Sequence, residues 1–405
     1  MLLVLAWRNI WRNRSRSLIT MGAVMCFVLL ATFTASIQKG VFENLIKNVV
    51  SLYSGHVQLH GKGYWEEQNL EHCFYYEDSL KQIVKSESGV LALAGRLESY
   101  ALASSGDITT GCLAMGIEPA QEQTITHAED KLVSGAYLED EDQAVLVAEG
   151  LASRLNLGLG DTLILLSQGF YGSTAAAQYP IKGLLHFGSP ELNKRVVYMP
   201  LAQAQNWLDA PGYASALAMA LEPGAEPNEV ARVLRAEVDT SVYEVMSWEE
   251  LMPEVVQYIK ADTGGMYIFL GVLYLLISFG IFSTLLMMFA ERQREFGMLI
   301  SLGMHKSKIA LMVLMESITL TFAGALAGGA LSLPFVLYFN RYPLRMDGEI
   351  NEVYEQFGFE PIFPTSLEPS VFLIQAGLVF IVGFVLGLYP FWKIMRMDPV
   401  KAMRT

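Results

Sequence analysis

Four long apolar runs divide the chain. Leu18–Ile37 has 20 residues and Thr263–Ala290 has 28 residues without a charge. Ile309–Asn340 has 32 residues and one charge, Glu316, and Ser370–Trp392 is uncharged. Because about 20 apolar residues cross the roughly 30 Å hydrocarbon core of a bilayer, each run predicts a transmembrane helix. The first run, with its basic flank, also has the order of a signal peptide, but its apolar core is long for one, so we expect it to remain a membrane helix.

A long polar segment, Gln38–Asp262, separates the first two runs. It carries 14 Lys/Arg and 31 Asp/Glu. The whole chain of 405 residues is 52% hydrophobic and 17% charged, with a mean hydropathy of +0.34. These values are too apolar for a soluble protein and too polar for one built only of spanning helices, so they indicate a membrane protein with one large water-facing domain. The net charge of −13 argues against nucleic acid as a partner.

Three short segments are basic: residues 1–17, the connection 290–309, and the tail after Trp392. Short basic connections face the cytoplasm, and four spans leave both termini on the same side. We therefore expect both termini to be cytoplasmic and the acidic domain to lie outside. The predicted order is an amphipathic entry helix (1–17), helix 1 (18–37), the outer domain (38–262), helix 2 (263–290), a cytoplasmic connection (291–309), helix 3 (310–340), an outer loop (341–369), helix 4 (370–392) and a cytoplasmic tail (393–405).

The entry segment has aromatic and basic residues at helical spacing. Trp7 and Trp11 are four residues apart, as are Arg8 and Arg12. A helix here has one aromatic and one basic face, which is typical of a segment anchored in the membrane interface. An ordinary basic flank that fixes orientation is the plainer interpretation, and the two are compatible.

The outer domain is predicted to be mixed α+β with a helical stalk at each end. The exit stalk begins with a capping-box pattern, Ser247 to Glu250, and Pro253 is expected to kink it. Tyr171–Ala177 is small and polar and is expected to be a loop. The entry stalk is indicated by Val41, Leu45, Val49 and Leu52. Strands are expected at 55–60, 144–148, 162–167, 179–185 and 195–199, and helices at 149–156 and 201–207.

No catalytic or metal motif is convincing. The stretch from Gly55 to Lys62 has the wrong spacing and the wrong strand–loop–helix order for a phosphate loop. His56 and His60, four apart on a strand, are about 13 Å apart, too far to share an ion. Cys73 and Cys112 could pair in an oxidising compartment, and their spacing leaves this open. We expect no cofactor, no metal and no enzymatic activity in this chain.

Small residues four apart occur in the last two apolar runs, as Gly324/Gly328 and Gly383/Gly387. They allow close helix approach, so we expect packing within the bundle rather than a dedicated subunit contact. Glu316 lies about two turns inside its helix. We expect it to pair with a cation near the 290–309 connection rather than to relay protons.

The 290–309 connection, ERQREFGMLISLGMHKSKI, closely resembles a stretch of the FtsX/MacB/LolC–LolE permeases, the membrane subunits of ABC transporters. The start (AWRNIWRNRSRSLIT), an outer segment (VLVAEGLASRLNLGLGDTLIL) and the end (YPFWKIMRMDPVKAMRT) match in order. The resemblance implies an α-helical protein with four transmembrane helices and a MacB-like periplasmic core domain between helices 1 and 2, in the bacterial inner membrane. It also implies a coupling helix that seats in a separate ATPase, at Glu291, Arg294, Glu295, Gly297, Leu302 and Gly303.

The resemblance further implies two copies of a cytoplasmic ABC ATPase, which hold ATP and Mg²⁺, and a second permease copy or paralogue. The expected function is ATP-driven extraction of lipoproteins or other lipidated molecules from the outer leaflet, with a periplasmic carrier or lipoprotein as partner. Alternatives are an FtsX-like mechanotransmitter acting on a cell-wall hydrolase, MacB-like efflux of peptides or antibiotics, and a membrane-anchored sensor without an ATPase. Apolar faces of helices 1 and 2 are expected to line the substrate cleft, at Val28, Phe33, Met266, Phe269 and Leu273.

Overall fold

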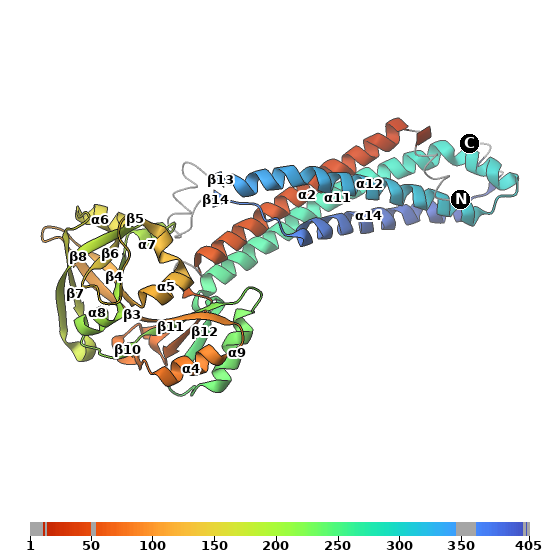
Figure 1. The fold of residues 1–405 in the computed structure, drawn as a ribbon. Coiled ribbons are helices and arrows are strands. Elements are labelled where there is room, and N and C mark those ends of the chain that lie inside the picture. The colour runs from red at the N-terminus through yellow and green to blue at the C-terminus, as the bar shows by residue number, and fades with distance from the viewer. Residues whose placement is uncertain (1–10, 13, 50–53, 346–361, 400–401, 403–405) are drawn as a thin grey trace. The chain divides into compact units, whose positions relative to one another are not determined.

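The structure is a computed structural model that describes residues 11–12, 14–49, 54–345, 362–399 and 402 (Figure 1). It divides into two compact units. The helical unit holds Met1–Glu43, Ile259–Arg345 and Ile362–Thr405, and the α/β unit holds Asn44–Tyr258 with Met346–Pro361. The two units are described separately.

Four long helices make up most of the helical unit: α2 (Arg14–Val49), α11 (Pro253–Ser301), α12 (Lys306–Arg341) and α14 (Pro369–Met395). All four are long and apolar enough to cross a membrane. The prediction of four such helices is confirmed. A short ribbon pairs β13 (Leu344–Arg345) with β14 (Ile362–Phe363).

Helix α11 is much longer than the apolar run that predicts it. Its 49 residues correspond to about 74 Å at 1.5 Å per residue. The helix is unbroken through the adjacent glycines Gly264 and Gly265, where a Cβ would meet nothing within 4 Å. At its other end it continues through residues 291–301, so the predicted connection 291–309 is largely helical. Only residues 302–305 separate α11 from α12.

The glycine pairs lie at close helix–helix contacts. A Cβ at Gly328 would lie 2.6 Å from the Met25 carbonyl oxygen of α2, and one at Gly324 would lie 2.8 Å from the Val24 Cβ. A Cβ at Gly383 of α14 would lie 2.5 Å from the Thr321 side chain of α12. Gly387, one turn on, faces Leu314 and Ser317 of α12. The small residues thus let α2 and α14 approach α12 closely.

Aromatic and polar contacts hold α11 against the other helices. Phe27 of α2 packs on Tyr274 of α11, with ring centroids 5.6 Å apart. The Tyr274 hydroxyl donates a hydrogen bond to the Gln375 side chain of α14. Phe282 of α11 and Tyr389 of α14 meet edge to face at 5.2 Å.

The α/β unit is built on one ten-stranded sheet in the order β12-β1-β11-β3-β4-β9-β6-β8-β5. Strand β7 pairs with both β3 and β8, so β3, β4, β9, β6, β8 and β7 form a closed ring. Only β4–β9 and β6–β8 are parallel among the described pairs. The strands are β1 (Val57–Gly61), β2 (Phe74–Tyr75), β3 (Val90–Ser104), β4 (Thr109–Ile117), β5 (Leu132–Gly135), β6 (Val145–Ala148), β7 (Thr162–Gln168), β8 (Thr174–Leu185), β9 (Val196–Pro200), β10 (Tyr213–Ala214), β11 (Ala216–Leu221) and β12 (Tyr243–Ser247).

Two large hydrophobic cores, with a small third cluster of Ala94, Ile125, Ala218 and Ala220, stabilise this unit. The larger one gathers buried residues of the six ring strands together with α6 and α8. The smaller one joins β1, β11 and β12 to α4 and α9. The helices are α3 (Tyr64–Glu67), α4 (Asp78–Ser86), α5 (Pro119–Thr126), α6 (Glu149–Leu155), α7 (Pro190–Asn193), α8 (Leu201–Trp207), α9 (Pro227–Glu237) and α10 (Trp248–Leu251), with 3₁₀ turns η2 (Leu70–His72), η3 (Ala128–Lys131) and η4 (Phe170–Gly172).

Two local predictions need correction. Residues 174–177 are not a loop, because they pair with β7 as the first part of β8. The exit stalk is broken rather than kinked: α10 ends at Leu251, Met252 leaves helical geometry, and Pro253 begins α11. Proline suits a first helical position because its missing N–H would have had no partner there. Leu52 of the predicted entry stalk lies outside the described residues.

The cysteine and histidine candidates are structural. Cys73 and Cys112 are free thiols, and burial raises the pKa of each to about 12. The His60 ring is buried, bonds to Gln58 at 2.7 Å and stacks on Trp65. Among the described residues, no group of three His, Cys, Asp or Glu could hold a metal ion.

Candidate functional site at the turn between two membrane helices

The turn between α11 and α12 is a regular helix stop. Gly303 has φ +95°, the left-handed region that glycine adopts at little cost. The Met304 N–H donates to the Leu299 carbonyl and the Gly303 N–H to the Ile300 carbonyl, both at 3.0 Å. This pair of bonds is the Schellman motif, which satisfies the last carbonyls of a helix. Gly303 therefore ends α11, and α12 begins three residues later.

Apolar side chains project from this turn. Leu302 is 78% exposed, Met298 57% and Met304 38%. Glu291, Arg294 and Glu295 are exposed on the same stretch of α11. Gly297, by contrast, is buried, because it lies on the inner side of α11. Gly297 is therefore the one coupling candidate that is not at the surface, while the other five are exposed.

A chain of ion pairs runs behind the turn. Arg292 Nη1 of α11 donates to Glu316 Oε2 of α12 at 2.8 Å, with both side chains buried. The expected pairing of Glu316 with a nearby cation is confirmed. Arg292 Nε also lies 3.6 Å from Glu295 Oε2. Arg12, just before α2, donates to both Glu295 carboxylate oxygens, at 2.8 and 2.6 Å. The entry segment is thus joined to α11 and α12.

The end of α14 closes the same end of the bundle. Lys306 at the start of α12 donates to the Met397 carbonyl at 2.6 Å. Lys393 Nζ lies 4.9 Å from the centroid of the Phe289 ring of α11. Ile394 and Met397 are buried in a core with Phe289 and other residues of α11 and α12. The α11–α12 turn is therefore held from two sides, by the entry segment and by the C-terminal end of α14.

The candidates for the membrane anchor and the substrate cleft differ in their exposure. Trp7 and Arg8 lie outside the described residues, while Trp11 is 60% exposed. Val28 is fully buried against Gly328, so its assignment to a substrate cleft is wrong. Phe33 packs against Phe339 of α12, with tilted rings whose centroids are 5.4 Å apart, and is half-buried. Of the three candidates on α11, Phe269 is 50% exposed, and Met266 and Leu273 are half-buried.

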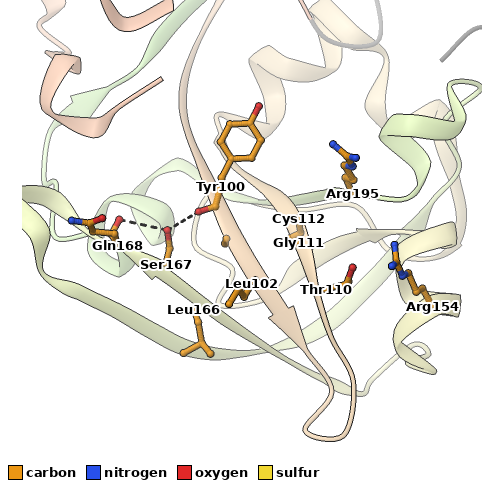
Figure 2. Close-up of a pocket in the computed structure, with 11 residues that line it drawn as sticks. Tyr100, Leu102, Thr110, Gly111, Cys112, Arg154, Leu166, Ser167, Gln168 and Arg195 are labelled. Carbon is orange, nitrogen blue, oxygen red and sulfur yellow. Dashed lines mark hydrogen bonds between the residues drawn. The ribbon is translucent and has the colours of Figure 1, made fainter. Parts of the chain in front are cut away.

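A second feature is a groove on the α/β unit, with a volume of about 690 Å³ (Figure 2). It is lined by parts of β3, β4 and β7, by Arg154 of α6 and by Arg195 before β9. Figure 2 shows the two arginines on one side and Leu102 and Leu166 on the other. Arg195 pairs with Glu191 at 3.0 Å, and none of the lining residues is acidic. The groove can thus hold an anionic group beside an apolar surface.

Family models match both parts of the chain. The FtsX-like permease C-terminal family matches residues 267–399, which include α12, α14 and most of α11. The MacB-like periplasmic core domain family matches residues 18–237, more than half of the chain. The protein is an ABC-transporter permease of the FtsX/MacB/LolC–LolE type.

Relatives of this permease cover most of its length. It is 21% identical over 406 residues to the lipoprotein-releasing system transmembrane protein LolC of Xylella fastidiosa, covering 97% of this chain and 95% of that one. LolC of Neisseria meningitidis is 20% identical, over 80% of this chain and 81% of its own. The periplasmic region of MacB from Actinobacillus actinomycetemcomitans is a structural neighbour with a TM-score of 0.38 and 13% identity, covering 53% of this chain and 97% of that one.

Sequence reasoning about this permease missed one contact and one grouping of residues. Nothing in the spacing indicates that Arg12 reaches Glu295, 283 residues away. The two arginines of the groove are also separated by 41 positions and carry no motif. The ion pair and the shared position of the two arginines both depend on tertiary packing alone.

Proposed function

We propose that this permease receives movement from two copies of a cytoplasmic ATPase at the α11–α12 turn and passes it to the α/β domain. The observation that supports this most strongly is the exposed apolar tip formed by Met298, Leu302 and Met304. An exposed apolar patch of this kind marks a site of protein–protein contact, and an apolar helix end can insert into a groove on a partner. The permease has no nucleotide motif, so ATP and Mg²⁺ would be held by the partner.

The contacts behind the tip support the same proposal. Arg292–Glu316 joins α11 to α12, and Arg12–Glu295 joins the entry segment to α11. A displacement of the turn would therefore move three helices together. Because α11 is one helix from Ser301 to Pro253, it can carry such a displacement toward the α/β domain, which we place in the periplasm between the first two spans, with both termini cytoplasmic.

Binding of the ATPase is tested by co-purification. The permease is co-expressed with an ABC ATPase encoded beside it. Leu302→Asp is expected to abolish ATPase association, because it places a charge at the centre of the contact. Leu159→Asp is the matched control, since Leu159 is 54% exposed in the α/β unit. Equal association of both variants, or none by the unchanged permease, would refute the proposal.

For the substrate, we propose a lipoprotein or another lipidated molecule taken from the outer leaflet, with a second permease copy or a paralogue completing the complex. The named relatives that cover this chain over most of its length are lipoprotein-releasing proteins, which supports this choice. The test uses the complex in proteoliposomes with a fluorescent lipoprotein and a soluble carrier. ATP-dependent transfer to the carrier is expected. ATP hydrolysis without transfer, with activation of an added cell-wall hydrolase, would favour the mechanotransmitter instead.

A further inference from the structure

A small groove lies between the first part of α2 and the middle of α12. Its volume is about 110 Å³. Five residues line it from α2 and the segment just before, and three from α12: Trp11, Arg14, Ser17, Leu18, Met21, Thr319, Leu320 and Ala323. No described part of α11 or α14 lines it, so it is a feature of the α2–α12 pair.

The groove begins where the close contact of the two helices ends. At Gly324 a Cβ would lie 3.0 Å from the Met21 carbonyl oxygen, so α2 and α12 touch there. One turn earlier on each helix, Ser17 and Leu320 are both buried, while Leu18 is 57% exposed. The helices therefore leave a space that is closed at its base and open along the outside of the bundle.

The walls of this groove are apolar. Leu18, Leu320 and Ala323 present hydrocarbon. The Thr319 hydroxyl is satisfied within its own helix, because it donates to the Met315 carbonyl at 2.7 Å. The walls formed by Leu18, Thr319, Leu320 and Ala323 therefore have no hydrogen bond to offer a polar ligand and suit an alkyl chain.

The open end of the groove is cationic. Arg14 is exposed and forms no ion pair with any residue that the structure describes. Arg12 differs, since its guanidinium is occupied by Glu295. Trp11, 60% exposed beside Arg14, is of the residue type that prefers the level of lipid headgroups. A free guanidinium over an alkyl-lined groove matches an anionic headgroup joined to an acyl chain.

The size of the groove limits which ligands can fit in it. Pockets for drug-sized molecules have volumes of about 300–1,000 Å³, so 110 Å³ takes only part of one alkyl chain. The rest of the ligand must remain in the bilayer, as a phospholipid does. Basic pockets between membrane helices are known to bind anionic lipid headgroups.

We propose that this groove binds one anionic phospholipid, whose phosphate contacts Arg14 and whose acyl chain lies against Leu18, Leu320 and Ala323. Because Arg14 is two residues from Arg12, which holds Glu295 near the α11–α12 turn, the lipid would fix the entry segment in the position that supports this turn. This assignment holds whatever substrate the permease moves.

The experiment is native mass spectrometry of the full-length permease titrated with dioleoyl-phosphatidylglycerol or dioleoyl-phosphatidylcholine. Phosphatidylglycerol is expected to bind more tightly. Arg14→Gln is expected to weaken its binding about fivefold, the effect of one basic residue near an anionic lipid surface, and Arg14→Lys to restore most of it. Arg341→Gln, which removes the same charge at the other end of α12, is the matched control and is expected to change little.

A second pair of variants tests the acyl-chain part of the groove. Ala323→Leu fills the space and is expected to weaken phosphatidylglycerol binding while Arg14 is unchanged. Ala330→Leu, at an exposed position two turns along α12, is the control. Equal affinity for the two lipids, equal effects of Arg14→Gln and Arg341→Gln, or unchanged binding in Ala323→Leu would each overturn the proposal. The thermal midpoint of each variant is measured as a control, to check that the variant is folded.

Discussion

Arg292 and Glu316 form a buried ion pair between α11 and α12, with 2.8 Å between Nη1 and Oε2 and side-chain exposures of 9% and 4%. The pair lies directly behind the turn that we propose as the ATPase contact. A buried pair of this kind fixes the position of two helices more than it adds stability, because desolvation offsets much of the attraction.

Breaking the Arg292–Glu316 pair should lower the free energy of unfolding of the permease. Glu316→Gln leaves the Arg292 charge buried beside a neutral amide, and we expect a loss of about 3–5 kcal/mol. Glu295→Gln breaks the exposed pair with Arg12 and should cost less than about 1 kcal/mol. Thermal unfolding of the purified permease in detergent measures both. If the two variants lose the same stability, the burial of the pair has no energetic consequence.

The close contact of α2 with α12 predicts a contrast between adjacent glycines. Gly328→Ala forces the new methyl group against the Met25 carbonyl, and we expect a loss of about 1–3 kcal/mol. A Cβ at Gly329 would meet nothing within 4 Å, so Gly329→Ala should be neutral or gain up to about 1 kcal/mol from helix propensity. Thermal midpoints of the two variants, measured side by side, give the answer. Equal loss at both positions would contradict the packing described here.

The helix stop at Gly303 predicts that two variants with a similar loss of stability differ in the ATPase activity of the complex. Gly303→Ala places a Cβ at φ +95°, which costs about 1–2 kcal/mol and favours continuing α11 through the turn. We expect a clear fall in the ATPase activity of the complex that depends on the permease. Gly106→Ala imposes similar strain at φ +97° in the α/β unit and should leave that activity unchanged. Equal activities of the two variants would show that the turn geometry does not matter.

Burial of His60 makes the α/β unit sensitive to acid. Burial, and then the charge of Arg96, lower the pKa of His60 from 6.5 to about 3. Between pH 6.5 and pH 3 the unfolded chain binds a proton at His60 that the folded unit does not. The contribution of His60 to the free energy of unfolding is therefore fully kept above pH 6.5 and is lost as the pH falls toward 3. The slope from this group is up to about 1.4 kcal/mol per pH unit.

His60→Gln should therefore flatten the fall in thermal midpoint between pH 6.5 and pH 5, because glutamine does not titrate. His186→Gln is the control, since His186 is exposed. The midpoints are followed by near-UV circular dichroism of the full-length permease. An unchanged slope in His60→Gln would mean that other groups cause the acid sensitivity.

The sequence was sufficient for the four membrane helices, because long apolar runs have few alternatives in a folded chain. It was also sufficient for the strand at 162–167 and the helix at 201–207, where local pattern and tertiary context agree. It failed at residues 174–177, whose alanines have little strand preference and pair only because β7 lies beside them. The cation that pairs with Glu316 could not be chosen from several nearby, since side-chain direction along α11 decides it.

The glycine pair of α11, Gly264 and Gly265, determines where this helix bends most easily. Each glycine costs about 1 kcal/mol relative to alanine in a helix, so the weakest backbone of this 49-residue helix is at Gly264–Gly265, five and six residues past Ile259, where α11 enters the helical unit. Bending strain will collect at this point instead of spreading along the helix. Alanine at both positions would make α11 stiffer and would remove the point at which it bends.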